Sequence, residues 1–131
     1  MTFRLPVALA ALSMLCAPLL AHHSAAAEYF GQVVTWQAVI TRFSWMNPHT
    51  FVYFDAKNPG GVMTNYICEG SAPSGLIGNG WTRNTLKPGD HVTVKGYRAK
   101  DRADGCKIRS VVFPDGHEMI MGWDGSNAAP R

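Results

Sequence analysis

Apolar and polar side chains alternate along the segment from Phe30 to Met46, which is the longest β pattern in the chain. The apolar positions in its first part are Val34, Trp36, Ala38 and Ile40. Phe43 and Trp45 then occupy the opposite phase, so they would face the other side of a regular strand. A phase change inside one strand indicates a β-bulge, which allows a long strand to bend between two parts of a sheet.

Five shorter stretches follow this segment, and turn-forming residues separate them. We predict strands over Thr50–Ala56, Val62–Glu69, His91–Arg98, Cys106–Phe113 and His117–Met121. Between the third and fourth strands, Ser71–Asn79 is rich in glycine and serine and can form at most a short helix. Three strands, a helical connection and further strands follow the order of the OB fold. We therefore predict an all-β, small OB-like barrel of five to six strands, with a short helical connection between strands 3 and 4. The alternative is a small β-sandwich.

The first twenty-one residues have the organisation of a secretion signal. Arg4 supplies a positive n-region, and Leu5–Leu20 is an uncharged apolar run that is short for a membrane span. Cleavage after Ala21 would leave His22 as the new amino terminus, whereas the competing site after Ala27 would remove both histidines. We favour the first site because it lies closer to the apolar run. We expect residues 1–21 to be a signal peptide, 22–124 the OB-like domain and 125–131 a flexible tail, in a periplasmic or secreted protein.

Composition narrows the class of protein. Without the signal about 110 residues remain, which is the length of one ordinary domain, and no later stretch could span a bilayer. The formal net charge of +3 is too small to indicate binding to nucleic acid. The sequence contains no nucleophile elbow, phosphate loop, dinucleotide fingerprint or paired carboxylates. We therefore expect a binding protein and not an enzyme.

Two cysteines remain after export. Cys16 leaves with the signal, whereas Cys68 and Cys106 belong to the mature chain. Two cysteines in an oxidising compartment more often form a disulfide than a metal pair. We predict a disulfide between Cys68 and Cys106, and the alternative is two separate buried thiols.

The last predicted strand carries a soft set of metal ligands. His117, Met119, Met121 and Trp123 share one face if the strand alternates regularly. One imidazole and two thioethers suit Cu(I), and an aromatic ring beside the metal can add a cation–π contact. This set is similar to the His/Met/Trp site of small periplasmic copper chaperones, although the order of the ligands differs. The alternative is that the two methionines fill the core.

A second candidate metal site lies at the predicted mature amino terminus. If cleavage follows Ala21, His22 offers both an α-amine and an imidazole to one metal ion. His23 or His49 could complete a set of nitrogen ligands for Cu(II). The alternative is a mobile end exposed to solvent.

Basic residues gather on the fourth and fifth strands and on their loop. They are Lys95, Arg98, Lys100, Arg102, Lys107 and Arg109. In OB folds this hairpin commonly contacts oligonucleotides or oligosaccharides. An exported protein rarely meets nucleic acid, so Arg98, Lys100 and Arg102 would bind an anionic glycan or a partner protein. Trp81 and Arg83 could line a binding surface, but Trp81 could equally anchor the helical connection.

The chain resembles a family of small exported bacterial proteins catalogued as a domain of unknown function. The resemblance rests on His22-His23-Ser24, Trp45-Met46-Asn47-Pro48-His49, Gly80-Trp81-Thr82-Arg83 and Leu86-Lys87-Pro88-Gly89-Asp90, followed by Val92-Thr93-Val94 and Gly96-Tyr97. It implies a periplasmic or secreted β-barrel domain and no particular activity. It also implies that His22 and His23 stay in the mature protein.

Two functional interpretations follow from these observations. The first is a small periplasmic binding module whose most concrete ligand is copper. The second is a metal-free adaptor or accessory subunit that binds a periplasmic protein or a small ligand through the barrel face and the basic hairpin. The His-x-Met-x-Met strand distinguishes them, because an adaptor has no need for it.

Overall fold

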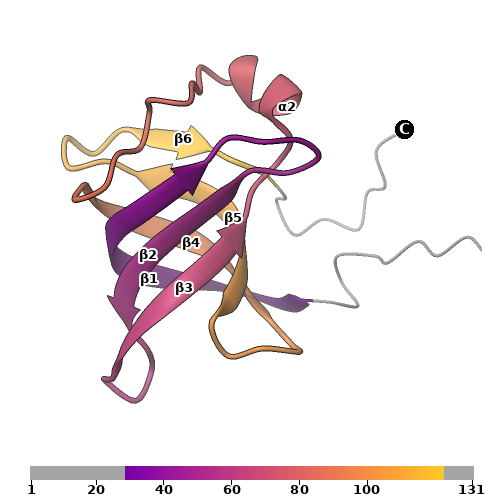
Figure 1. Cartoon of the computed structure of the whole chain (residues 1–131). Helices are drawn as coiled ribbons and strands as arrows, with labels where there is room; N and C mark the ends of the chain where they lie inside the picture. The colour runs from indigo at the N-terminus through magenta and orange to yellow at the C-terminus, as the bar shows by residue number, and fades with distance from the viewer. Residues whose placement is uncertain (1–28, 123–131) are drawn as a thin grey trace, which may run out of the picture.

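The computed structural model describes residues 29–122 of the chain (Figure 1). The predicted signal peptide, the predicted tail, His22, His23 and Trp123 lie outside the described residues. The strands are β1 (Tyr29–Ser44), β2 (Phe51–Lys57), β3 (Met63–Glu69), β4 (His91–Ala99), β5 (Gly105–Val112) and β6 (Glu118–Ile120), and the helix is α2 (Pro73–Ile77). The all-β class and the short helix between the third and fourth strands are confirmed.

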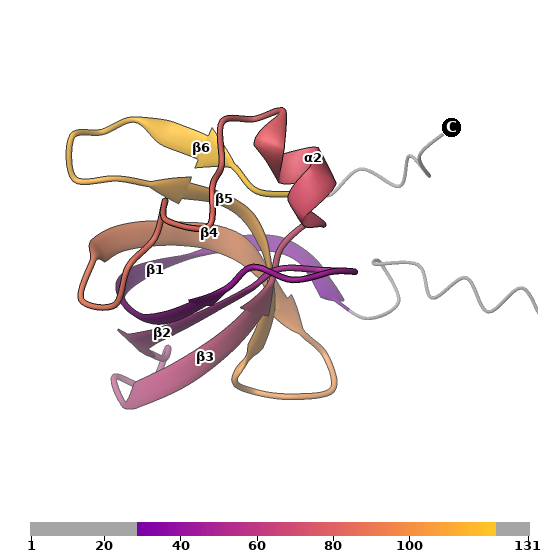
Figure 2. The same cartoon turned by 45° about the horizontal axis from the view of Figure 1, so that its top comes forward.

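The sheet closes on itself. Its strand order is β3-β2-β1-β4-β5-β6, and an additional parallel pairing joins β3 to β5. Five strands therefore form a ring, and β6 continues the sheet from the edge of β5 (Figure 2). The parallel pairing contains the pairs Ile67–Gly105, Cys68–Cys106 and Glu69–Lys107, and we call it the closing seam. This arrangement confirms the predicted OB-like fold of five to six strands.

The long strand β1 serves both halves of the ring. It pairs with β4 from Tyr29 to Val39 and with β2 from Val39 to Ser44. The register with β2 shifts between Ile40 and Arg42, which is the irregularity that the phase change in the sequence predicts. The bend at this point lets one strand reach both neighbours.

The interior of the ring is built around aromatic side chains. Trp36, Phe54 and Tyr66 come from three different strands, and their ring centroids lie between 5.3 and 6.0 Å apart. None of the three is more than 3% exposed. Burial of each such ring stabilises the fold by on the order of 2 kcal/mol, so this cluster is the centre of the core.

The helix α2 and the turn after it cover one end of the ring. Leu76 and Trp81 are each 1% exposed, and the indole Nε1 of Trp81 donates to the carbonyl oxygen of Ile120 at 2.8 Å. Gly70 lies beneath this cover. A Cβ atom at Gly70 would lie 2.6 Å from Thr50 Oγ1 and 2.9 Å from Met121 Cγ, so only glycine fits there without displacing its neighbours.

The structure also tests the predicted disulfide and the predicted last strand. The disulfide between Cys68 and Cys106 is confirmed, with Cα atoms 4.4 Å apart. The last strand is shorter than predicted and begins at Glu118, because His117 belongs to the preceding turn, where the Phe113 amide donates to its carbonyl oxygen. Within residues 29–122, no helix combines the length and the apolar character that a membrane crossing needs.

Candidate functional site

A half-buried carboxylate stands at the end of the closing seam. Glu69 is the last residue of β3, and its side chain is 18% exposed. The parallel register places Lys107 of β5 opposite Glu69. Cys68 and Cys106, the residues that precede this pair in the two strands, are covalently bonded to each other. The disulfide therefore sets the register that brings the carboxylate and the ammonium group together.

Three donors converge on Glu69 from three other parts of the chain. Lys107 Nζ lies 3.2 Å from Oε1, and the hydroxyl of Tyr29, the first residue of β1, donates to Oε2 at 3.2 Å. Nδ1 of His49, in the loop between β1 and β2, contacts Oε1 as well. We call these four residues the Glu69 cluster. It joins segments that are far apart in the sequence around one carboxylate.

His49 is the member of the Glu69 cluster that reaches solvent. Its side chain is 46% exposed, whereas that of Lys107 is 17% exposed. With Nδ1 on the carboxylate, Nε2 has no hydrogen-bond partner among residues 29–122. A carboxylate that holds one ring nitrogen selects the tautomer and leaves the other nitrogen as a lone-pair donor. His49 is therefore oriented in the way that metal-binding histidines usually are.

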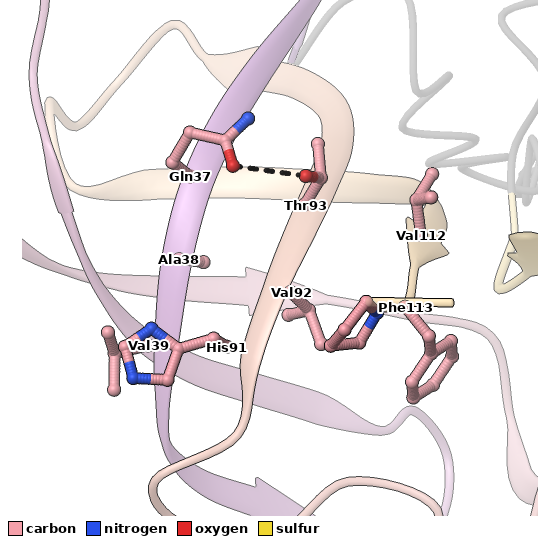
Figure 3. A pocket seen from close by; sticks show the side chains of 9 residues that line it. Gln37, Ala38, Val39, His91, Val92, Thr93, Val112 and Phe113 are labelled. Carbon is pink, nitrogen blue, oxygen red and sulfur yellow. Dashed lines mark hydrogen bonds between the residues drawn. The ribbon is translucent and has the colours of Figure 1, made fainter. Parts of the chain in front are cut away.

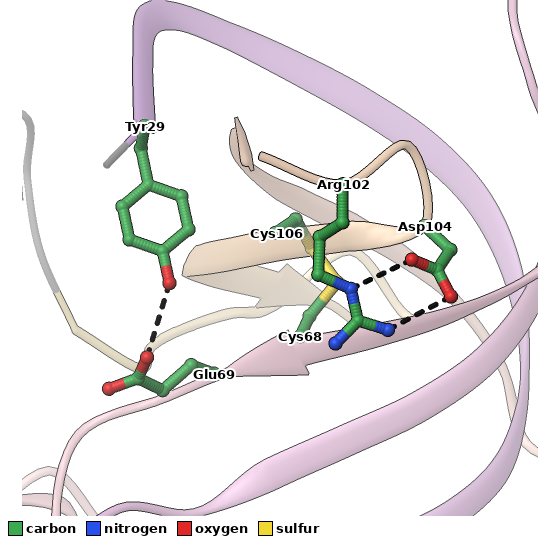
Figure 4. Close-up of a disulfide and its surroundings, with 6 residues drawn as sticks. All are labelled: Tyr29, Cys68, Glu69, Arg102, Asp104 and Cys106. Carbon is green, nitrogen blue, oxygen red and sulfur yellow. Dashed lines mark hydrogen bonds and ion pairs between the residues drawn. A yellow bond between two sulfur atoms is a disulfide. The ribbon is translucent and has the colours of Figure 1, made fainter. Parts of the chain in front are cut away.

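Glu69 and Tyr29 of the Glu69 cluster line a cleft of about 370 Å³ (Figure 4). Tyr29 and the loop between β4 and β5 form its walls, and Cys106 is part of its lining. In that loop Arg102 donates to both carboxylate oxygens of Asp104, at 2.8 and 2.9 Å. This hydrogen bond lowers the pKa of Asp104. The two charges neutralise each other, so this wall of the cleft offers little net charge to a ligand.

The predicted Cu(I) ligands of the last strand lie in different environments. Met121 is fully buried and packs against Gly70, and Met119 is partly buried against the core. The ring of His117 stacks on Phe113 with centroids 4.4 Å apart in the exposed turn. Asp115 bonds both the backbone amide and Nδ1 of His117, and the backbone hydrogen bond is the main cause of the lowered pKa of Asp115. The sulfur of Met121 is thus in the core, whereas the imidazole of His117 belongs to a surface turn.

Neighbouring carboxylates neutralise much of the predicted basic hairpin. The ion pairs are Lys95–Glu118, Arg102–Asp104 and Lys107–Glu69. Lys100 Nζ lies 6.0 Å from the centroid of the Phe30 ring. Arg98 is half-buried in a separate cleft at the end of β4. The hairpin is therefore not a continuous cationic surface.

The remaining predicted residues lie apart from the Glu69 cluster. Trp81 is in the core, so a partner would have to displace the cover of the ring to contact its indole. Arg83 is exposed in the turn that follows Trp81. Within residues 29–122, no three or more His, Cys, Asp or Glu side chains are grouped so that they could hold a metal ion.

A smaller cleft of about 260 Å³ is lined by residues of β1, β4 and the end of β5 (Figure 3). Gln37 Oε1 accepts a hydrogen bond from Thr93 Oγ1 at 3.2 Å, and His91 and Phe113 stand at other parts of its lining. The hydrogen bond joins two neighbouring strands and satisfies both polar groups. The lining of this cleft contains no Asp, Glu, Lys or Arg side chain, and the hydrogen bond between Gln37 and Thr93 is internal to the sheet.

Sequence reasoning did not identify Glu69 or Tyr29 as site residues. Glu69 looks like an isolated carboxylate because its partners lie in other elements. One signal was available, since Glu69 and Lys107 each follow a cysteine of the predicted disulfide. A parallel pairing of the two cysteine-bearing strands would have placed these charges side by side.

Comparison with known proteins gives a family and no function. No curated protein and no solved structure matches the chain. Residues 9–107 match the profile of DUF6152, a family of unknown function. The matched range contains all four residues of the Glu69 cluster and ends before β6. The match covers most of the chain, which therefore belongs to the family of unknown function DUF6152.

Proposed function

We propose that the protein is exported and works in the periplasm as a small binding module that holds Cu(II) through His49 and the mature amino terminus. The observation that carries this proposal is the orientation of His49. Glu69 holds its Nδ1, and Nε2 has no partner among residues 29–122. Imidazole nitrogens suit Cu(II), and a carboxylate behind the ring raises the basicity of the ligand.

The amino terminus can supply the other ligands. Tyr29 donates to the same carboxylate that holds His49, so the chain enters the domain at the Glu69 cluster. His22 precedes Tyr29 by seven residues, which can span up to about 25 Å when extended. Cleavage after Ala21 would give His22 a free α-amine beside its imidazole. His22 and His49 would then provide three nitrogens, and His23 could add a fourth.

The methionines of the last strand are a weaker basis for a copper site. Met121 would have to leave a fully buried position before its sulfur could reach His117, which bonds Asp115 in the turn. Removal of a methionine side chain from a core costs about 2–5 kcal/mol. For this reason the copper proposal rests on nitrogen ligands at the Glu69 cluster.

A Cu(II) titration of the exported, processed protein tests the proposal. We expect binding to one equivalent, with an electron paramagnetic resonance spectrum typical of nitrogen ligands. His49→Ala should lower the affinity at least tenfold, and removal of residues 22–27 should lower it by a similar factor or more. His117→Ala is the matched control, because it removes the other carboxylate-bonded histidine, and it should leave the affinity unchanged.

Two results would overturn the copper proposal. One is an intact mass that shows Glu28 as the first residue of the exported protein, because both amino-terminal histidines would then be lost. The other is equal Cu(II) affinity in the wild type and in His49→Ala. Acid should weaken Cu(II) binding in the wild type, because protons compete for imidazole and amine nitrogens.

A metal-free adaptor is the second candidate, and exposed apolar side chains favour it. Val62 is 63% and Met63 is 62% exposed at the turn between β2 and β3. Met63 also lines a cleft of about 600 Å³ beside β1. Exposed apolar groups next to a hollow surface are typical of protein contacts. Cross-linking from position 62 to one periplasmic protein, lost in Met63→Ser, would support this function.

A further inference from the structure

An arginine continues the core-facing row of β4. Val92, Val94 and Gly96 are buried at alternate positions of this strand, and the same alternation places Arg98 on their face. Gly96 approaches β5 so closely that a Cβ atom would lie 2.3 Å from the carbonyl oxygen of Lys107. Arg98 lies beside the β2–β3 hairpin and the β4–β5 loop, which are at the end of the ring away from α2 (Figure 1).

Arg98 lines a cleft of about 350 Å³ at this end of the ring. Asn58 and Thr64 of the β2–β3 hairpin lie on one side of the cleft, and Asp104 of the β4–β5 loop lies on the other. In the part of the chain that the structure describes, the guanidinium of Arg98 makes no ion pair and no hydrogen bond to protein. A half-buried cation without a partner is costly, so the fold alone does not account for it.

The other polar groups of the cleft have partners of their own. Both oxygens of Asp104 accept hydrogen bonds from Arg102. Asn58 Oδ1 accepts the backbone N–H of Val62 at 3.0 Å. Neither Asp104 nor Asn58 is hydrogen-bonded to Arg98 among the described residues. The donors of Arg98 are therefore available to a group from outside the chain.

The cleft also has an apolar part, to which Pro59, Ala103 and the ring of Tyr66 belong. Tyr66 lines it, is 1% exposed, and stacks on Phe54 with centroids 5.3 Å apart. The volume falls in the lower part of the range of about 300–1,000 Å³ that is typical of small-ligand sites. A fitting ligand is small, with an anionic group beside a short apolar part.

We propose that this cleft binds the free carboxylate of a small organic acid or of a peptide end, and that Arg98 holds the carboxylate. The planar guanidinium matches a carboxylate with two parallel hydrogen bonds, which a lysine cannot provide. Pro59 and Ala103, which are exposed at the cleft, would contact the carbon chain next to the carboxylate. The site is separate from the Glu69 cluster and does not require copper.

Nuclear magnetic resonance titration of the mature protein tests this proposal. The probes are N-acetylalanine, the tripeptide Ala-Ala-Ala, and the carboxyl-terminal amide of each. At millimolar concentrations we expect a carboxylate probe to shift the amide signals of Asn58, Thr64 and Ala103, and its amide to leave them unchanged. Binding of the tripeptide alone would identify a peptide end, and binding of both would identify a small organic acid.

Arg98→Met separates a binding role from a role in the fold. It keeps most of the apolar stem and removes the charge, so the affinity should fall about tenfold to a hundredfold while thermal stability stays equal or rises. Arg109→Gln removes an exposed charge of β5 and is the matched control, with unchanged affinity. The proposal is wrong if no carboxylate binds at millimolar concentration, if amides bind as well as acids, or if Arg98→Met loses stability and keeps its affinity.

Discussion

Two histidines of this protein contact a carboxylate through Nδ1, and they differ in where that carboxylate lies. His117 bonds Asp115 within a single turn, and Asp115 is 70% exposed. His49 bonds Glu69, which lies in another element and is 18% exposed. A local pair can form whenever its turn forms, whereas the Glu69 pair exists only after the ring has closed. The contrast separates a histidine that shapes a turn from one that belongs to a tertiary site.

Removal of the disulfide is the change that we expect to have the largest effect on stability and on this contrast. Replacing both Cys68 and Cys106 with Ala should lower the free energy of unfolding by about 4 kcal/mol, because the bond closes a loop with a sequence separation of 38. Urea denaturation measures this loss. The imidazole signals of His49 should move in the nuclear magnetic resonance spectrum, and those of His117 should stay in place. Equal movement of both would break the comparison.

The two methionines near β6 give the next largest effect. Met121→Ala should cost about 3 kcal/mol of stability, since the side chain is fully buried, whereas Met119→Ala should cost about 1 kcal/mol. Met121→Leu nearly preserves the volume and should cost less than about 1.5 kcal/mol. Thermal unfolding checks this order. A Met121→Ala variant as stable as the wild type would mean that this methionine is not a core residue and would revive its role as a ligand.

A smaller effect distinguishes the two carboxylates directly. Glu69→Gln should lower the stability by about 1 kcal/mol, because a half-buried ion pair with Lys107 and the contact with His49 are weakened. It should also lower the Cu(II) affinity about tenfold, since His49, the proposed ligand, loses the carboxylate that holds its Nδ1. Asp115→Asn is the matched variant and should change neither quantity measurably. If both variants behave alike, His49 has no special status.

The smallest expected effect is the pH dependence of stability that comes from Glu118 of β6, which contacts residues of β4 and β5. The hydroxyl of the buried Ser110 donates to Glu118, and Lys95 lies 3.3 Å from it, so the pKa of Glu118 is lowered. Because this pKa is lowered in the folded protein, the contacts of Glu118 stabilise the fold fully above the ordinary pKa of a glutamate. This stabilisation is lost as the pH falls through the lowered value. The difference in melting temperature between the wild type and Glu118→Gln should therefore shrink in acid. A difference that grows in acid would contradict this assignment.

The sequence predicts the strands of this protein better than it predicts the environments of their side chains. The phase change after Ile40 marks the bulge in β1, because alternation records which face each side chain occupies. The alternation of Met119 and Met121 is equally regular, but alternation does not say whether a face points to solvent or to the core. Met121 is buried because α2 and the Trp81 turn fold over that end of the ring. The Glu69 cluster was missed because its members meet only through the parallel seam.

The closing seam also has a consequence for how the ring is closed. The pairs β1–β2 and β2–β3 join neighbouring segments, whereas β3 pairs with β5 across α2 and β4, which lie between them in the chain. The native pairing of Cys68 with Cys106 requires closure of a loop with a sequence separation of 38, so we expect their oxidation to fix the seam once this loop has closed. The seam consists of three residue pairs, so β3 and β5 are held together weakly when the cysteines are reduced. The disulfide adds a covalent link between these two strands. The disulfide therefore keeps the ring closed at the shorter of the two strand pairings that β3 makes.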